Sequence, residues 1–202
     1  MSPPHPGLRA PHPHGIPAVP HRGQGSGFSL LELLVVVAII GLINGITVAM
    51  SGQEWQRERV NAVAIGLAGW LEEVRGNALR ETSDTSSSGG CVVSVSSLSN
   101  AAAGSTLASV APTTCASSAT FVIPGVINNA DRYDIGLTNA ATITFTPRGS
   151  VTSSSDALVQ IFLVGTRQLR CVRVSAILGL VRIGSNAAAS SSTASCTDFS
   201  HY

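Results

Sequence analysis

The hydrophobic and polar positions divide the chain into four segments. Residues 1–27 are rich in proline, histidine and glycine and hold arginine but no acidic side chain, so they cannot bury enough apolar surface to fold alone. Residues 28–50 are almost wholly apolar. Residues 51–82 alternate apolar and polar positions at helical spacing. Residues 83–202 contain short runs typical of strands, separated by loops rich in Ser and Ala.

The apolar run from Phe28 to Met50 has the length of a transmembrane helix, since a helix of that many residues spans roughly 30 Å. Glu32 is its only ionisable residue. A charge at the bilayer centre costs roughly 2.5–3.5 kcal/mol on insertion scales, so we expect this carboxylate to have a use. Arginines precede the run, which predicts a cytoplasmic N-terminus and an exported remainder.

The next segment, Glu54 to Glu81, lacks proline and predicts a continuation of the same helix. Its apolar residues fall at steps of three and four, which makes one face of the helix apolar. These residues are Val60, Val63, Leu67, Trp70, Leu71, Val74 and Ala78. Two interpretations stay open: the apolar face packs on a globular domain, or the helix lies detached on the membrane surface.

The remainder predicts a small β-rich extracytoplasmic domain. Strand-like runs occur at Cys91–Val95, Thr120–Ile123, Ala141–Thr146, Leu158–Val164, Leu169–Ser175 and Ile177–Ile183. The rest of 82–118 is interpreted as loop, and Ser185–Ser195 as a mobile low-complexity stretch. The predicted fold class is therefore α+β, with a long N-terminal transmembrane and amphipathic α-helix packed on a C-terminal meander of antiparallel strands forming one sheet.

Four cysteines, Cys91, Cys115, Cys171 and Cys196, follow the apolar run. Their number is even and none forms a C-x-x-C pair, which favours disulfides in an oxidising compartment over zinc. Three pairings are open. Local pairing, Cys91 with Cys115 and Cys171 with Cys196, closes two loops, each stabilising by about 3 kcal/mol. The second of these bonds is the favoured one, because it ties down the C-terminal tail.

Composition and motifs argue against an enzyme. The chain has 202 residues, a net charge of +1 and only 11% charged residues, so it has no general bias towards polyanions. It contains no G-x-S-x-G, no paired histidine and carboxylate cluster and no glycine-rich phosphate loop. We therefore predict no catalytic residue, no metal and no cofactor. Asp131 and Asp134 lack the further oxygen ligands of a calcium loop and are interpreted as part of a solvated turn.

The stretch GFSLLELLVVVAIIG, Gly27 to Gly41, resembles the type IV pilin-like family, which includes major and minor pilins and the pseudopilins of type II secretion. The resemblance implies the pilin fold and removal of residues 1–27 by a prepilin peptidase, which cuts between Gly27 and Phe28 and methylates Phe28. The competing interpretation is a secretory signal peptide cleaved after the apolar run. Thr47 and Ala49 fit its small-x-small rule poorly.

The resemblance also implies a use for Glu32, which would attract the N-terminal amine of a neighbouring subunit. At an effective dielectric near 20, opposite charges 4 Å apart attract by about 4 kcal/mol, comparable to the insertion cost. The implied partners are other pilins in a filament, the prepilin peptidase, the inner-membrane assembly platform and membrane lipid. The implied location is the bacterial inner membrane, crossed once, with the C-terminal domain in the periplasm or an extracellular filament.

Two later stretches, ITFTPRGSV (Ile143–Val151) and RCVRVSAILGLVRIG (Arg170–Gly184), resemble the GspH/FimT-type minor pilins. Some competence-type members carry a Gly-Arg-x-Arg element that contacts DNA. Here that element reads Gly-Leu-Val-Arg and ends at Arg182, so its first arginine is absent. If the arginines of this region shared one face, they would track phosphates, and a salt-dependent gel shift would separate DNA uptake from a purely structural filament role. The candidate contacts are Arg148, Arg170, Arg173 and Arg182, with Arg167 nearby in sequence.

Overall fold

The computed structural model describes residues 29–80, 90–125 and 130–200. The chain divides into two compact units, Met1–Gly45 and Ile46–Tyr202, which are described separately. The predicted leader and the predicted cleavage site, Gly27 and Phe28, lie outside the described residues.

Helix α1 comprises Leu30–Ala78. Ser29 caps its N-terminus, because the Ser29 Oγ accepts a hydrogen bond of 3.2 Å from the Glu32 N–H. In the unit Met1–Gly45, the described side chains of the helix are all exposed. No helix in the described part of the chain offers an apolar stretch long enough to cross a membrane.

In the unit Ile46–Tyr202, the helix buries the face that its spacing predicts. The seven apolar residues of the predicted face are all buried, whereas Ile65 and Gly69 on the other side are exposed. Trp70 also anchors a loop, since its Nε1 donates a 3.0 Å hydrogen bond to the carbonyl of Ser118. The helix therefore packs on the β domain and is not detached from it.

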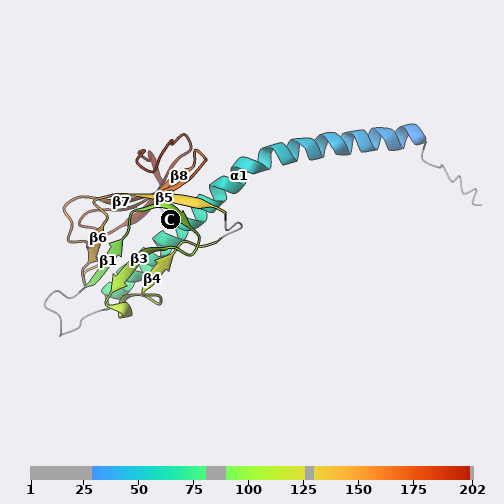
Figure 1. Ribbon diagram of the computed structural model, residues 1–202. Helices are drawn as coiled ribbons and strands as arrows, with labels where there is room; N and C mark the ends of the chain where they lie inside the picture. The colour runs from blue at the N-terminus through green and yellow to red at the C-terminus, as the bar shows by residue number, and fades with distance from the viewer. Residues whose placement is uncertain (1–28, 81–89, 126–129, 201–202) are drawn as a thin grey trace, which may run out of the picture. The chain divides into compact units, whose positions relative to one another are not determined.

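In the part of the chain that the structure describes, ten strands form two sheets, and all of their pairs are antiparallel (Figure 1). The four-stranded sheet has the order β4 (Thr120–Val122), β3 (Thr106–Ala111), β1 (Cys91–Val95), β6 (Thr142–Phe145). The six-stranded sheet has the order β10 (Asp198–Ser200), β9 (Val181–Asn186), β8 (Leu169–Val174), β7 (Ala157–Leu163), β5 (Arg132–Thr138), β2 (Leu98–Ala102). A short 3-10 helix, η1 (Thr113–Cys115), follows β3. The α+β class is confirmed, but the expectation of one sheet was wrong.

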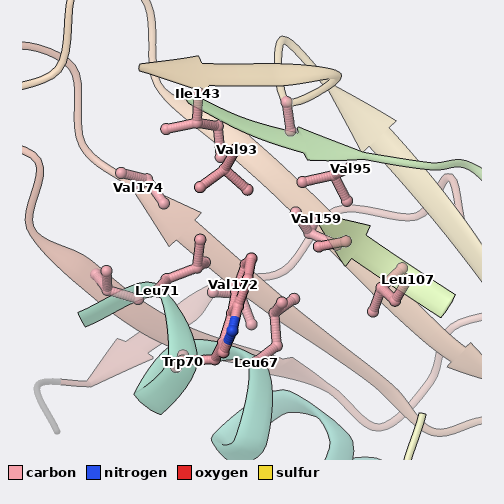
Figure 2. Packing of buried hydrophobic residues seen from close by; sticks show 14 of the residues in the cluster. Leu67, Trp70, Leu71, Val93, Val95, Leu107, Ile143, Val159, Val172 and Val174 are labelled. Carbon is pink, nitrogen blue, oxygen red and sulfur yellow. The ribbon is translucent and has the colours of Figure 1, made fainter. Parts of the chain in front are cut away.

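The main core lies between the helix and the two sheets. Figure 2 shows Leu67, Trp70 and Leu71 of the helix beside Val172 and Val174 of β8, with Val93 of β1 close by. All of these side chains belong to one buried cluster. Helix and sheets therefore share one apolar core, whose burial from water stabilises their packing.

A second, smaller cluster lies on the other face of the six-stranded sheet, under the C-terminal tail. It contains Phe162, Leu169, Cys171 and Ala189, with Leu158, Ala194, Cys196 and Phe199 packed against it. Glycines make room for the tail, since a Cβ built at Gly136 would lie 2.6 Å from the Ser192 carbonyl oxygen and one at Gly184 would lie 2.7 Å from the Phe199 ring. Gln160 Nε2 also donates to the Ala194 carbonyl at 3.0 Å. The tail is therefore packed in place, contrary to the expectation of a mobile stretch.

The strand expected at Ile177–Ile183 was wrong in its first half. Ile177 and Gly179 have φ angles of 65° and 63°, which are left-handed and belong to a turn. The turn joins β8 to β9, whose register pairs Val174 with Val181. Arg75 of the helix holds it, since its guanidinium donates to the carbonyls of Gly149 at 3.0 Å and of Leu178 at 3.3 Å.

Candidate functional site

Glu32 occupies the third position of helix α1, in its first turn. Ser29 and Glu32 have the S-x-x-E spacing of a capping box, a signal that the sequence analysis did not use. A carboxylate in the first turn also faces the positive end of the helix dipole, which stabilises the helix by typically 0.3–1 kcal/mol. The first-turn position and the capping-box spacing therefore predict a local role for Glu32 in the helix start, in addition to any role in pairing with a neighbouring subunit.

The side chains around Glu32 form a continuous apolar surface. Leu30 and Leu31 are 82% and 74% exposed, and the apolar residues up to Ile43 are exposed as well. The one amide in this stretch, Asn44, satisfies its donor within the helix, since its Nδ2 donates to the Ile40 carbonyl at 2.8 Å. A helix that is apolar all round is typical of a membrane span or of a buried core element. Within the described chain, nothing covers this surface.

The four predicted sheet arginines do not lie on one face. Along β8 successive side chains alternate, so Val172 and Val174 point into the main core and Arg170 lies on the same side. Arg170 Nε lies 3.4 Å from Asn61 Oδ1 on the helix. Burial lowers the pKa of Arg170, as does the nearby Arg57 charge, while Glu58 opposes them.

Arg173 and Arg182 lie on the opposite face, where the register of β8 and β9 places them directly across from each other. The Phe199 ring covers Arg173, with 4.1 Å from the guanidinium carbon to the ring centroid. Asp156 Oδ2 lies 3.8 Å from Arg173 Nε, an ion-pair distance too long for a hydrogen bond. Arg148 is exposed on the turn after β6. The structure thus places Arg173 beside Arg182 and separates both from Arg170.

Asp131 and Asp134 are not part of a solvated turn. Asp131 forms a 2.6 Å ion pair with Arg59 of the helix, and the two side chains are only 12% and 21% exposed. Asp134 lies within β5, and its Oδ1 accepts a 2.7 Å hydrogen bond from the backbone N–H of Asn100. The two carboxylates therefore fix the helix and β2 to β5.

Tyr133 lies between these two residues in the sequence, and its side chain belongs to the main core and is 1% exposed. Burial, together with the nearby Asp131 charge, raises the pKa of Tyr133 from 10.0 to about 12, and the Arg59 charge partly opposes this shift. Below pH 10 both the folded and the unfolded state hold the proton. Between pH 10 and about 12 only the unfolded state releases it, so stability falls over this window, on the order of 2–3 kcal/mol in total.

We expect the absorbance of the Tyr133 phenolate to titrate with a midpoint near pH 12. Replacing Tyr202 by phenylalanine leaves Tyr133 as the only tyrosine, because the chain has two. A midpoint near pH 10 in that variant would contradict the buried position of the ring.

The structure pairs Cys91 with Cys115 and Cys171 with Cys196. The first bond joins β1 to η1 within the main core, and the second joins β8 to the tail that covers the second cluster. This is the local pairing weighed in the sequence analysis. Each bond fastens a segment that has few apolar residues of its own.

Comparison with protein families identifies the class of motif at the start of the helix. Residues 24–43 match the prokaryotic N-terminal methylation motif. This motif is the type IV pilin and prepilin signature, so the resemblance of Gly27–Gly41 to the type IV pilin-like family is confirmed. The match includes Gly27, Phe28 and Glu32, and a helix packed on antiparallel sheets is consistent with the pilin fold. No curated protein sequence and no solved structure matches the chain.

Proposed function

We propose that this chain is a minor pilin or pseudopilin, a non-catalytic filament subunit of a type II secretion or type IV pilus machine. The observation that carries the proposal is the combination of the methylation motif with an apolar helix surface that nothing in the described chain covers. An exposed apolar surface of this extent is typical of a segment with a membrane or protein partner. The disulfide-bonded β domain that follows suits an oxidising compartment.

In this proposal the run Phe28–Met50 inserts in the bacterial inner membrane as a single span, and the β domain lies in the periplasm or in the extracellular filament. The prepilin peptidase removes residues 1–27 and methylates Phe28. The assembly platform and other pilins are then the protein partners.

The test is the intact mass and N-terminal sequence of the chain extracted from membranes after co-expression with a prepilin peptidase. We expect a chain that begins at N-methylated Phe28. A chain that begins near Ser51, as after signal-peptide cleavage, or one that still carries Met1, would overturn the proposal.

Replacing Glu32 by glutamine separates its two roles. Glutamine keeps the capping-box chemistry of the helix start but removes the charge. If pairing with a neighbouring N-terminal amine is the main role, Glu32→Gln is expected to be cleaved normally and to lose most of its incorporation into filaments, as is Glu32→Ala. Incorporation is measured by the amount of the chain in sheared filaments relative to the membrane.

Glu32→Asp, which keeps the charge, is the matched control and is expected to retain more incorporation than Glu32→Gln. Normal incorporation of Glu32→Gln, with loss only in Glu32→Ala, would assign the residue to helix capping instead of charge pairing.

The alternative function, DNA uptake through an arginine-bearing sheet, receives less support from the geometry. A phosphate track needs several cations on one accessible face. Arg170 is turned towards the helix, and Arg173 is covered by Phe199 and lies near Asp156. Arg148 and Arg182 remain as candidate contacts.

A further inference from the structure

Two adjoining hollows open at one end of the β domain, between helix α1 and the turn that joins β7 to β8. Their volumes are about 310 and 460 Å³. Both are lined by Gln56, Gly165 and Thr166. The first also reaches Arg59 and Arg132, and the second reaches Arg167 and Gln168.

The second hollow is lined mostly by polar groups, whereas the first has both polar and apolar ones, and the charged residues of the two linings are mainly arginines. The one carboxylate in the lining, Asp131, is already paired with Arg59 at 2.6 Å. Arg167 is exposed and makes no ion pair with any residue that the structure describes. Gln168 is only 8% exposed, yet its Oε1 accepts no hydrogen bond from a described residue. The hollows therefore offer one exposed cation, Arg167, without an ion-pair partner among the described residues, and beside it lies Gln168, whose buried Oε1 lacks a described donor.

The position of the hollows along the chain points to the kind of ligand. If the apolar run inserts in the membrane, as the proposed function requires, it ends at Met50. Gln56 follows six residues later in the same helix, which is about 9 Å of helical rise. The headgroup layer on each side of the hydrocarbon core is roughly 5–8 Å thick. Gln56 thus lies just outside the layer that holds the lipid phosphates, close enough for lipid headgroups to reach the hollows.

The acidic residues on the neighbouring turn of the helix do not neutralise the positive charge of Arg167. Glu54 pairs with Arg57 at 3.3 Å, and Glu58 lies near Arg170, where its charge acts on the pKa of that arginine. Arg167 has no such neighbour among the described acidic residues. Arginine binds phosphate well, because its planar guanidinium presents several donors to the phosphate oxygens.

We infer that these hollows bind the headgroup of an anionic phospholipid, with the phosphate held by Arg167 and the polar remainder of the headgroup placed beside Gln56, Thr166 and Gln168. The inference rests on the proposed function, because only a membrane-inserted chain brings the hollows to the headgroup layer. It deepens that function because membrane lipid would then have two roles. It would surround the apolar helix, and it would also be a ligand of the β domain.

The experiment uses the full chain, cleaved by the prepilin peptidase and purified in a mild detergent with defined phospholipids. Native mass spectrometry counts the lipid molecules retained when phosphatidylglycerol or phosphatidylcholine is supplied. We expect retention of phosphatidylglycerol, reduced about fivefold in Arg167→Gln, since one basic side chain contributes about that factor at an anionic surface. The matched control is Arg148→Gln, which removes another exposed arginine from a turn outside the lining and is expected to retain the lipid as the unchanged chain does.

Equal retention in the unchanged chain and in Arg167→Gln would overturn the inference, as would an equal loss in Arg148→Gln. Displacement of the lipid by inorganic phosphate alone would assign the site to free phosphate and would also overturn it. A parallel flotation with phosphatidylglycerol vesicles at high salt separates this inference from the proposed function. A chain that fails to float contradicts membrane insertion, whereas a floating chain without selective retention contradicts only the headgroup site.

Discussion

Replacing Leu67 by alanine is expected to lower the free energy of unfolding of the β domain by about 2–5 kcal/mol. Leu67 is fully buried in the main core, beside Val172 of β8 and near Trp70 of the same helix (Figure 2). Both sheets are fixed by antiparallel ladders, so the surroundings have little freedom to collapse into the space left behind. Because small domains are stable by only about 5–15 kcal/mol, the loss is a large fraction of the total.

The matched control is Ile65→Ala, two residues earlier on the exposed side of the same helix, where the side chain is 43% exposed. It changes helix propensity similarly but opens no core cavity, and we expect less than about 1 kcal/mol. Urea unfolding of the full chain in detergent, followed by the fluorescence of the buried Trp70, measures both variants. Equal destabilisation by the two substitutions would show that the helix does not use its predicted face.

The amphipathic half of the helix could be predicted from the sequence because its signal is local. Seven apolar residues recur at steps of three and four, and only one helix face satisfies that spacing. Strands β1, β6, β7 and β8 were likewise predicted, since each contains β-branched or large apolar residues. The local sequence of each of these elements is therefore enough to predict its secondary structure.

Strands β2 and β3 could not be predicted in the same way. Leu98–Ala102 and Thr106–Ala111 consist largely of Ser, Ala and Asn or Thr, which resemble a loop. They are strands because β5 and β1 supply their ladders, and that pairing is a property of the tertiary fold. β5 was not predicted for a related reason. In the sequence Asp131 and Asp134 indicate a turn, and their partners Arg59 and Asn100 become apparent only in the folded structure.

The features of the candidate site also differ in whether local sequence predicts them. The methylation motif and Glu32 are a contiguous pattern and were recognised directly. Side-chain alternation along β8 places Arg170 and Arg173 on opposite faces of the sheet, but only the tertiary fold decides which of them faces the helix. The hollows around Gln56 are lined by residues more than a hundred positions apart in the chain, so no local sequence pattern predicts them.

Replacing Cys171 and Cys196 together by alanine is expected to lower the free energy of unfolding by about 3 kcal/mol and to release the C-terminal tail. The sequence separation of 25 between these cysteines sets the chain entropy that the bond removes from the unfolded state. The tail also depends on the bond in the folded state. Its apolar contacts are those of the second cluster, a small group around Phe162, Leu169 and Ala189, and β10 adds only a three-residue ladder to β9.

The matched control is the double replacement of Cys91 and Cys115 by alanine, which opens a loop of nearly equal length, with a sequence separation of 24. The entropy term predicts a similar loss of global stability for both variants. Limited proteolysis distinguishes them, because only the loss of Cys171–Cys196 is expected to expose residues 187–197 to cleavage while the main core stays folded. A tail that stays protected without its disulfide would mean that Gly136, Gly184 and the Gln160 hydrogen bond suffice to hold it. Equal cleavage in both variants would mean that the second cluster is not an independent unit and unfolds with the main core.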